Sequence, residues 1–282
     1  MTKFTIVTPS FNAAAHIQTC VESVRNQNYP NVEHIVQDNL STDGTVEILS
    51  TLQMDGNDRA ELRIFVEPDH GQSDAINKGF LRATGDIVCW LNCDEFYLPG
   101  VLAQVAKVFE ERPATDVVFG DVIFVGGGLG EGRRRIGFPF NETMLIQYGC
   151  YIPSCATFLR RNIVSDGYLL DETYKVTMDF EYYVRLSKKG YKFKYLPIPI
   201  AKFTWHDSNV SLVNKERRVF ERERVQLEYG GFQCLGGARI WLFRLLKFYW
   251  ISRRLLVRVL RRAKSSITDA APSVRSLGQG HG

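Results

Sequence analysis

The fold is decided by residues 85–100, GDIVCWLNCDEFYLPG. Residues 87–91 are a short apolar run of strand-forming side chains, which predicts a strand buried on both faces. The end of this run brings Asn92, Asp94 and Glu95 together in one turn. Ligands of open parallel sheets bind beyond the carboxyl ends of the strands, and carboxylates there suit a Mg²⁺ or Mn²⁺ ion that also holds a diphosphate. The alternative is a solvated acidic turn without a ligand.

Three more strands are expected before this one, with a helix after each. The expected strands cover residues 4–8, 33–37 and 62–66, and the expected helices cover residues 13–26, 41–52 and 73–83. Strands that alternate with helices need crossover connections. The pattern therefore predicts the α/β class, with a doubly wound, mainly parallel sheet.

Polar side chains follow all four strands, at the point where each strand ends. They are Thr8 and Ser10, Asp38, Asp69, and Asn92 with Asp94. One polar residue after a strand is usually a cap or a turn former. Four such groups at the same edge of a parallel sheet instead favour a bound polar ligand.

Other phosphate-binding patterns are missing from the sequence. No GxxxxGK[ST] occurs, and the glycines of residues 126–132 lack the GxGxxG spacing, so this stretch predicts a flexible loop or hairpin. The arginines at 133–135 predict a solvated loop face, with the binding of an anionic substrate as the alternative.

The second half of the chain contains one further carboxylate of interest. A helix is expected over residues 179–189, ended by Gly190, and Asp179 stands at its start. The helix dipole favours a carboxylate in that position, so Asp179 is either a cap or a chemical group. The alternating charges of residues 215–224 predict a solvated helix.

Residues 239–264 carry nine Lys or Arg and no Asp or Glu, interleaved with tryptophans and aliphatic side chains. This pattern predicts a basic amphipathic helix over residues 231–264 that binds an anionic membrane surface. A helix packed on the catalytic domain is the alternative, and we expect no nucleic-acid partner because no reading motif accompanies the charge. Residues 265–282 are expected to form a disordered tail.

Length and composition are compatible with one domain, or with one domain and an appendage. The chain has 282 residues and 45% apolar side chains. Its six cysteines form no CxxC pair, which favours free thiols in a reducing compartment. We expect no signal peptide and no membrane-spanning segment.

Five pieces of the sequence, in order, resemble the nucleotide-sugar glycosyltransferases of family 2, which have the GT-A type fold. They are IVTPSFN at residues 6–12, STDGT at 41–45, EPDHGQSDAINKG at 67–79, WLNCDE at 90–95 and TMDFEY at 177–182. The resemblance covers residues 3–212. It implies a sugar transfer from a nucleotide-sugar, with inversion by direct displacement.

The resemblance also implies roles for individual residues. Nucleotide-sugar binding would fall to Thr8, Pro9, Ser10, Asp38, Asp69, Gln72, Asn92 and Asp94. Asn92-Cys93-Asp94 is similar to the DxD motif of the family, with Asn in the first position, so Asp94 is the expected ligand of a divalent metal (Mn²⁺ or Mg²⁺). His206 would complete the metal site. Asp179 would be the catalytic base, with Glu181 as the second candidate.

We therefore expect a catalytic domain over residues 1–230, divided into a nucleotide-sugar-binding half (1–115) and an acceptor half (116–230). The acceptor would be a glycan or a lipid-linked molecule of cell-surface polysaccharide synthesis, and the protein would lie in the cytoplasm, peripherally on the inner face of the membrane. Two alternatives remain: a non-catalytic nucleotide-sugar-binding module at the membrane, and a nucleotidyltransferase on a similar fold.

Overall fold

The computed structural model describes residues 1–55, 60–128, 132–205 and 213–230, together with scattered positions between 241 and 259. The chain forms two units, Met1–Cys234 and Leu235–Gly282. Every strand named below belongs to the first unit.

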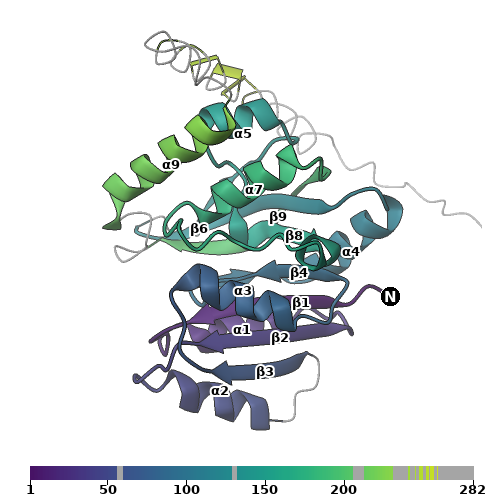
Figure 1. The fold of residues 1–282 in the computed structure, drawn as a ribbon. Helices are drawn as coiled ribbons and strands as arrows, with labels where there is room; N and C mark the ends of the chain where they lie inside the picture. The colour runs from purple at the N-terminus through teal and green to yellow at the C-terminus, as the bar shows by residue number, and fades with distance from the viewer. Residues whose placement is uncertain are drawn as a thin grey trace, which may run out of the picture. The chain divides into compact units, whose positions relative to one another are not determined.

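A parallel sheet forms the N-terminal part, as the sequence predicts (Figure 1). Its strands are β1 (Phe4–Ser10), β2 (Val32–Asp38), β3 (Glu61–Val66) and β4 (Ile87–Trp90), in the order β3-β2-β1-β4. The connecting helices are α1 (Ile17–Arg25), α2 (Thr45–Met54) and α3 (Gln72–Arg82). All neighbouring pairs are parallel, and Ser10 is in register with Asp38. The carboxyl ends of these strands therefore share one edge of the sheet.

The second part of the sheet is mixed. It contains β5 (Glu95–Tyr97), β6 (Val117–Gly126), β7 (Arg133–Arg135), β8 (Thr157–Arg160) and β9 (Phe193–Trp205), and its helices are α4 (Val101–Glu111), α5 (Glu142–Tyr148), α6 (Asn162–Ser165), α7 (Met178–Lys188) and α9 (Lys215–Tyr229). β8 joins the two parts by antiparallel pairing with both β4 and β6. Residues 201–203 of β9 pair with β5 in antiparallel fashion.

Close packing places α3 directly against β1. A Cβ atom at Gly79 would come within 2.3 Å of the Val7 Cγ1 atom, so only glycine allows this approach. At the end of β4, the fully buried Trp90 stacks on Tyr183 of α7. The ring centroids are 6.2 Å apart, and the angle between the ring planes is 24°. These contacts pack α3 against β1 and α7 against the end of β4.

Two predictions about charged segments are confirmed only in part. Residues 133–135 form strand β7 rather than a loop, but Arg133 and Arg134 are exposed as expected, and Arg134 pairs with the buried Asp121 at 2.7 Å. The helix over 215–224 exists as part of α9, but it is not solvated on all sides, because Glu221 and Val225 are buried. In both cases a partly exposed arginine compensates a buried carboxylate: Arg134 pairs with Asp121, and Arg217 pairs with Glu221.

The cysteines agree with the expected free thiols. Cys20, Cys89, Cys93, Cys150 and Cys155 form no disulfide. Within the part of the chain that the structure describes, no helix is long and apolar enough to cross a membrane. The predicted helix 231–264 is described only at scattered positions, which are helical, and the predicted tail 265–282 lies outside the described residues.

Candidate active site

A cavity of about 680 Å³ opens at the edge of the sheet where the parallel strands end. It is lined by the loop after β1, the start of α3, the turn after β4, and the segment that leads into α7. Of the predicted site residues, those that line it are Pro9, Ser10, Asp69, Gln72, Asn92, Asp94 and Asp179. Groups far apart in the sequence therefore share one cavity.

The turn between β4 and β5 is held by hydrogen bonds that leave the Asp94 side chain on the cavity wall. The backbone N–H of Asn92 donates to Glu95 Oε2 over 3.0 Å, and the N–H of Glu95 donates to the Asn92 carbonyl over 3.0 Å. Gln72 Nε2 donates to Asn92 Oδ1 over 2.6 Å. The Thr204 hydroxyl of β9 donates to the Asp94 carbonyl. Asp94 itself is half-buried.

Two predicted binding residues lie beneath the cavity rather than on its wall. Asp38 is fully buried and accepts hydrogen bonds from the Ser10 hydroxyl (2.9 Å) and from the backbone and hydroxyl of Ser41. Thr8 is also fully buried, and its hydroxyl is 2.9 Å from His34 Nε2. Asp38 therefore joins the end of β1 to the loop that follows β2, while Thr8 is part of the interior.

Asp69 and Gln72 lie on either side of a tight turn at the start of α3. Asp69 Oδ1 accepts from the N–H of Gly71 over 2.8 Å, and Gly71 has a φ of +114°, which favours glycine. The side chain of Asn39 accepts from the N–H of Asp69 over 2.9 Å. Burial raises the pKa of the Asp69 carboxyl above its ordinary value, and the charge of Asp74 adds to this effect.

Asp179 lies in the first turn of α7 and is one of the residues that line the cavity. It accepts from the N–H of Phe180 over 2.7 Å, and the Cys150 thiol donates to its Oδ2 over 3.7 Å. Burial raises the pKa of Asp179, although these hydrogen bonds oppose the shift. A carboxylate that binds protons more strongly than usual is a better general base.

Glu181, the second candidate for the base, is engaged elsewhere. Its buried carboxylate accepts from Arg185 Nε over 2.7 Å and from the Tyr229 hydroxyl over 3.0 Å, and the residue does not line the cavity. These contacts are typical of a structural ion pair.

Three further lining residues are not among the predicted binding residues, although the sequence places one of them, Glu95, in the turn with Asn92 and Asp94. Phe11 presents an aromatic ring that is 61% exposed, and Lys175 is the one lysine or arginine among the described lining residues. Glu95 is fully buried, and desolvation, with the neighbouring charge of Asp94, raises its pKa to about 8. The signal for Glu95 was its place next to Asp94. Phe11 and Lys175 lie in loops, where the sequence has no periodicity that indicates direction.

The residues present fit a divalent cation at the turn after β4. Asp94 offers a carboxylate on the cavity wall, and Glu95 Oε1 is buried without a hydrogen-bond partner among the described residues. Oxygen donors of this kind suit Mg²⁺ and Mn²⁺. The predicted ligand His206 lies outside the described residues.

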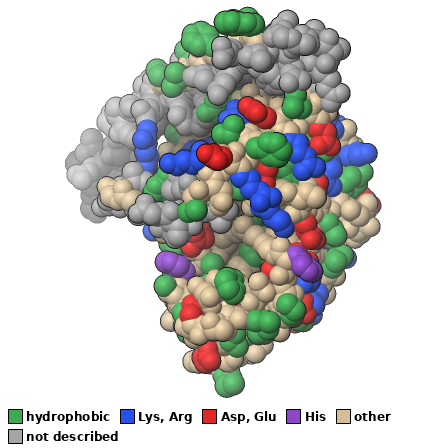
Figure 2. Space-filling view, turned by 60° about the vertical axis from the view of Figure 1, so that its left-hand side comes forward, with side chains coloured by type: hydrophobic (Ala, Val, Ile, Leu, Met, Phe, Trp, Pro, Cys, Tyr) green, Lys and Arg blue, Asp and Glu red, His purple; other side chains and the backbone are tan. Residues whose placement is uncertain are grey.

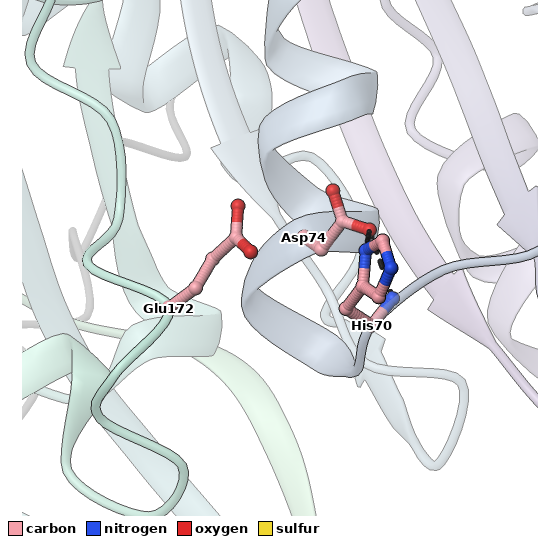
Figure 3. A group of neighbouring side chains, drawn as sticks. All are labelled: His70, Asp74 and Glu172. Atoms are coloured by element: carbon pink, nitrogen blue, oxygen red, sulfur yellow. Dashed lines mark hydrogen bonds and ion pairs between the residues drawn. The ribbon is translucent and has the colours of Figure 1, made fainter.

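A second group of potential metal ligands lies beside the start of α3. His70, Asp74 and Glu172 bring their ligand atoms within 4.8 Å of one another, with Glu172 reaching in from a separate loop (Figure 3). However, Lys78 Nζ is 3.0 Å from Asp74 Oδ2, and His70 Nδ1 is 3.1 Å from the same oxygen. The carboxylate of Asp74 is thus already neutralised by the protein itself.

The mixed α/β fold, with carboxylates around one cavity at the strand ends, defines a GT-A type transferase scaffold. Residues 5–168 match the sequence model of "Glycosyl transferase family 2", and the chain belongs to that family. It is therefore a glycosyltransferase.

Known relatives agree with this assignment. A "PGL/p-HBAD biosynthesis glycosyltransferase" of Mycobacterium tuberculosis is 29% identical over 202 residues, which cover 71% of this chain and 76% of the relative. An uncharacterized glycosyltransferase of the same species is 31% identical over 186 residues, covering 64% of this chain and 68% of the relative.

Solved structures share the fold at low sequence identity. Staphylococcus aureus TarS in complex with UDP-GlcNAc has a TM-score of 0.62 and 16% identity, over 82% of this chain and 73% of that one. The mannosyltransferase PcManGT of Pyrobaculum calidifontis, in complex with GDP-Man and Mn²⁺, has a TM-score of 0.61 and 15% identity, over 96% of this chain and 81% of that one.

Proposed function

We propose that the protein transfers a sugar, with inversion, from a nucleoside-diphosphate sugar to a hydroxyl group of a glycan or a lipid-linked acceptor. One observation carries the proposal: Asp94 and Asp179, from different halves of the chain, line the same cavity. A metal-binding carboxylate and a basic carboxylate are the two groups that such a transfer needs. The volume of about 680 Å³ is within the usual range for small-molecule sites.

The nucleotide-sugar is proposed to bind along the edge formed by the loop after β1 and the start of α3. The exposed ring of Phe11 is suited to stack on a base, as aromatic side chains do with unpaired nucleotides. Ser10, which is held by Asp38, and the side chains of Asp69 and Gln72 offer polar groups to the nucleoside. Solved relatives of the fold were crystallised with UDP-GlcNAc or GDP-Man, so both nucleotides are reasonable candidates.

Asp94, with Glu95 beside it, would hold a divalent cation, for which Mn²⁺ is the first choice because it is present in PcManGT. Bound there, the cation would supply Lewis-acid stabilisation of the diphosphate leaving group. Gln72 keeps the Asn92 amide oriented, and Lys175 adds a positive charge to the same wall.

The acceptor hydroxyl would lose its proton to Asp179 as it attacks the anomeric carbon. Direct displacement by one nucleophile inverts the configuration at that carbon. A positioned general base typically contributes about 10²–10⁴-fold to the rate. The raised pKa of Asp179 suits this role, because a stronger base gains more from each proton transfer.

We also propose a peripheral location on the cytoplasmic face of an anionic membrane, where a lipid-linked acceptor of cell-surface polysaccharide synthesis would be available. Support comes from the nine basic residues of 239–264 and from exposed apolar side chains at helical spacing, such as Trp241, Leu245 and Phe248.

Figure 2 shows the side of the molecule on which α9 lies. Basic, acidic and apolar side chains all occur on this side. In residues 239–264, by contrast, every charged side chain is basic. We therefore assign the attraction to the membrane to residues 239–264 rather than to α9.

A thermal-shift screen of nucleotide-sugars, with and without Mn²⁺, tests the proposal, followed by an assay of nucleoside diphosphate release. We expect one donor to raise the melting temperature in the presence of Mn²⁺, since a ligand at 100 times its Kd stabilises by about 2.7 kcal/mol. Release of pyrophosphate would indicate a nucleotidyltransferase instead. Binding of a donor without turnover would indicate a non-catalytic module, the alternative that Asn92 raises.

A further inference from the structure

A single buried carboxylate holds the cavity wall that leads into α7. Glu221 of α9 is 2% exposed, and it accepts hydrogen bonds from three successive backbone N–H groups. Its Oε1 accepts from the N–H of Lys175 over 2.9 Å, and its Oε2 accepts from those of Val176 and Thr177, each over 2.9 Å. The Thr177 hydroxyl also donates to Oε2, over 3.2 Å.

This arrangement gives hydrogen-bond partners to three backbone N–H groups in the segment just before α7, where no helix or strand supplies them. Charge-assisted hydrogen bonds of this kind are roughly twice as strong as neutral ones. Arg217 Nε, one turn earlier on α9, donates to Glu221 Oε1 over 2.7 Å and compensates the buried charge. Burial alone would raise the pKa of Glu221, but the hydrogen bonds from Lys175, Arg217 and the neighbouring backbone hold the pKa below its ordinary value. The carboxylate is therefore ionised at neutral pH.

The segment that Glu221 holds is a functional one. Lys175, Val176, Met178 and Asp179 all line the cavity, and Thr177 between them is the residue that precedes α7. The direction of the Asp179 side chain depends on the backbone of this first turn. Glu221 itself does not line the cavity.

A second set of contacts from α9 reaches the segment that leads to Cys150, another neighbour of Asp179. Gln226 Nε2 donates to the carbonyl of Ile146 over 2.8 Å, and Arg222 donates to the carbonyl of Tyr148. These carbonyls belong to the end of α5, which leads into Cys150, the residue whose thiol donates to Asp179. The helix α9 therefore supports both segments that enclose the proposed base.

We propose that Glu221 is a positioning residue for sugar transfer, which acts by fixing the backbone of residues 175–177 and through it the Asp179 carboxylate. The inference rests on the proposed function, because it needs Asp179 to act on the acceptor. The inference adds that the rate of sugar transfer depends on Glu221 of α9, a residue that does not line the cavity.

The test compares Glu221→Gln with Glu223→Gln, an exposed residue on the same helix that undergoes the same change of charge. In Glu221→Gln an amide NH₂ replaces one acceptor, so at least one of the three N–H groups loses its partner. We expect kcat to fall at least tenfold, while the Kd for the donor, measured by titration, changes by less than threefold. Glu223→Gln should match the wild type in both.

Two further measurements separate positioning from simple destabilisation. All assays are run at least 15 °C below the melting temperature of each variant, and amide hydrogen exchange is measured over residues 175–179. We expect faster exchange there in Glu221→Gln, and partial recovery of kcat in Glu221→Asp, which keeps the charge on a shorter side chain.

A wild-type kcat in folded Glu221→Gln would overturn the inference, even if its melting temperature falls. Unchanged exchange over 175–179 would also overturn it. Failure of the proposed function has a different signature, because the wild-type protein itself would then transfer no sugar, and the inference would fall with it.

Discussion

Gln72 Nε2 donates a 2.6 Å hydrogen bond to Asn92 Oδ1, and this contact joins the start of α3 to the turn that carries Asp94. The asparagine thus has a defined role in the structure although it stands where the family motif has an aspartate. Its side-chain oxygen is used to orient the turn. A carboxylate in the same place would accept the same hydrogen bond and add a negative charge beside the proposed cation.

Asn92→Asp is therefore expected to tighten metal binding. At an effective dielectric constant of about 20, an added unit charge about 4 Å from a cation is worth several kcal/mol before desolvation, so a gain in Mn²⁺ affinity of about tenfold is a conservative expectation. The measurement is the Mn²⁺ concentration that gives half-maximal activity at saturating donor. An unchanged value would mean that the cation does not bind near residue 92.

Asp179→Asn should lower kcat by about 10²–10⁴-fold, because it removes the proposed base while keeping the size and shape of the side chain. Donor affinity should stay within about threefold, as measured by titration with the nucleotide-sugar. A loss of donor binding would count against the assignment of Asp179 as the base.

The matched control is Glu181→Gln, two residues further along α7. Glu181 is bonded to Arg185 and Tyr229 and does not line the cavity, so its replacement should lower stability by about 1–3 kcal/mol with little effect on kcat. A control that was as inactive as Asp179→Asn, while still folded, would show that the choice between the two carboxylates is wrong.

The rate should depend on pH through Asp179. Burial raises the pKa of this carboxyl, and the base must be ionised to accept a proton, so kcat should fall as the pH is lowered through that raised pKa. The acid limb of the kcat–pH profile, measured at saturating donor and acceptor, is then expected above the pH of about 4 at which an ordinary aspartate titrates. A limb at or below that pH would contradict the prediction.

The raised pKa of Asp179 also affects the free energy of unfolding. The direction of this effect follows from the linkage between proton binding and folding. A carboxyl whose pKa is raised in the folded state binds its proton more tightly than in the unfolded chain. Its contribution favours folding at low pH, below the unfolded pKa, and is lost as the pH rises through the folded pKa. At neutral pH, Asp179→Asn should therefore melt at the same temperature as the wild type or higher.

Truncation after Gly230 keeps α9 and removes the basic stretch. We expect the shortened protein to retain transfer to a water-soluble acceptor and to lose binding to vesicles that contain anionic lipid, since each Lys or Arg near such a surface contributes about 1 kcal/mol. Co-sedimentation with anionic and with neutral vesicles measures this. If the truncated protein bound anionic vesicles as well as the full chain does, the membrane contact would lie elsewhere.

Most of the fold could be predicted from the sequence, because the patterns that indicate strands and helices lie within short stretches of neighbouring residues. The apolar runs at residues 4–8, 33–37, 62–66 and 87–91 predicted the parallel strands, and the structure confirms their order of alternation with helices. Parallel strands connected by crossovers must end at one edge, so the convergence of Ser10, Asp69 and Asp94 on one cavity followed from topology alone.

The predictions that are confirmed only in part concern charges in the second half. Arg134 pairs with Asp121 across neighbouring strands, and Glu221 binds a loop more than forty residues earlier in the sequence. Neither partner is visible from local spacing. An isolated charge is expected to face water, and only a long-range contact makes its burial favourable.

The sequence by itself determined the class of fold, the edge of the sheet at which the site lies and the family of the enzyme, because hydrophobic periodicity and short motifs are properties of neighbouring residues. Only the tertiary structure decided that Asp179 rather than Glu181 faces the cavity, that Asp38 and Thr8 lie beneath it, and that α9 supports its wall. These choices depend on which buried polar group finds its hydrogen-bond partner, and those partners come from distant parts of the chain.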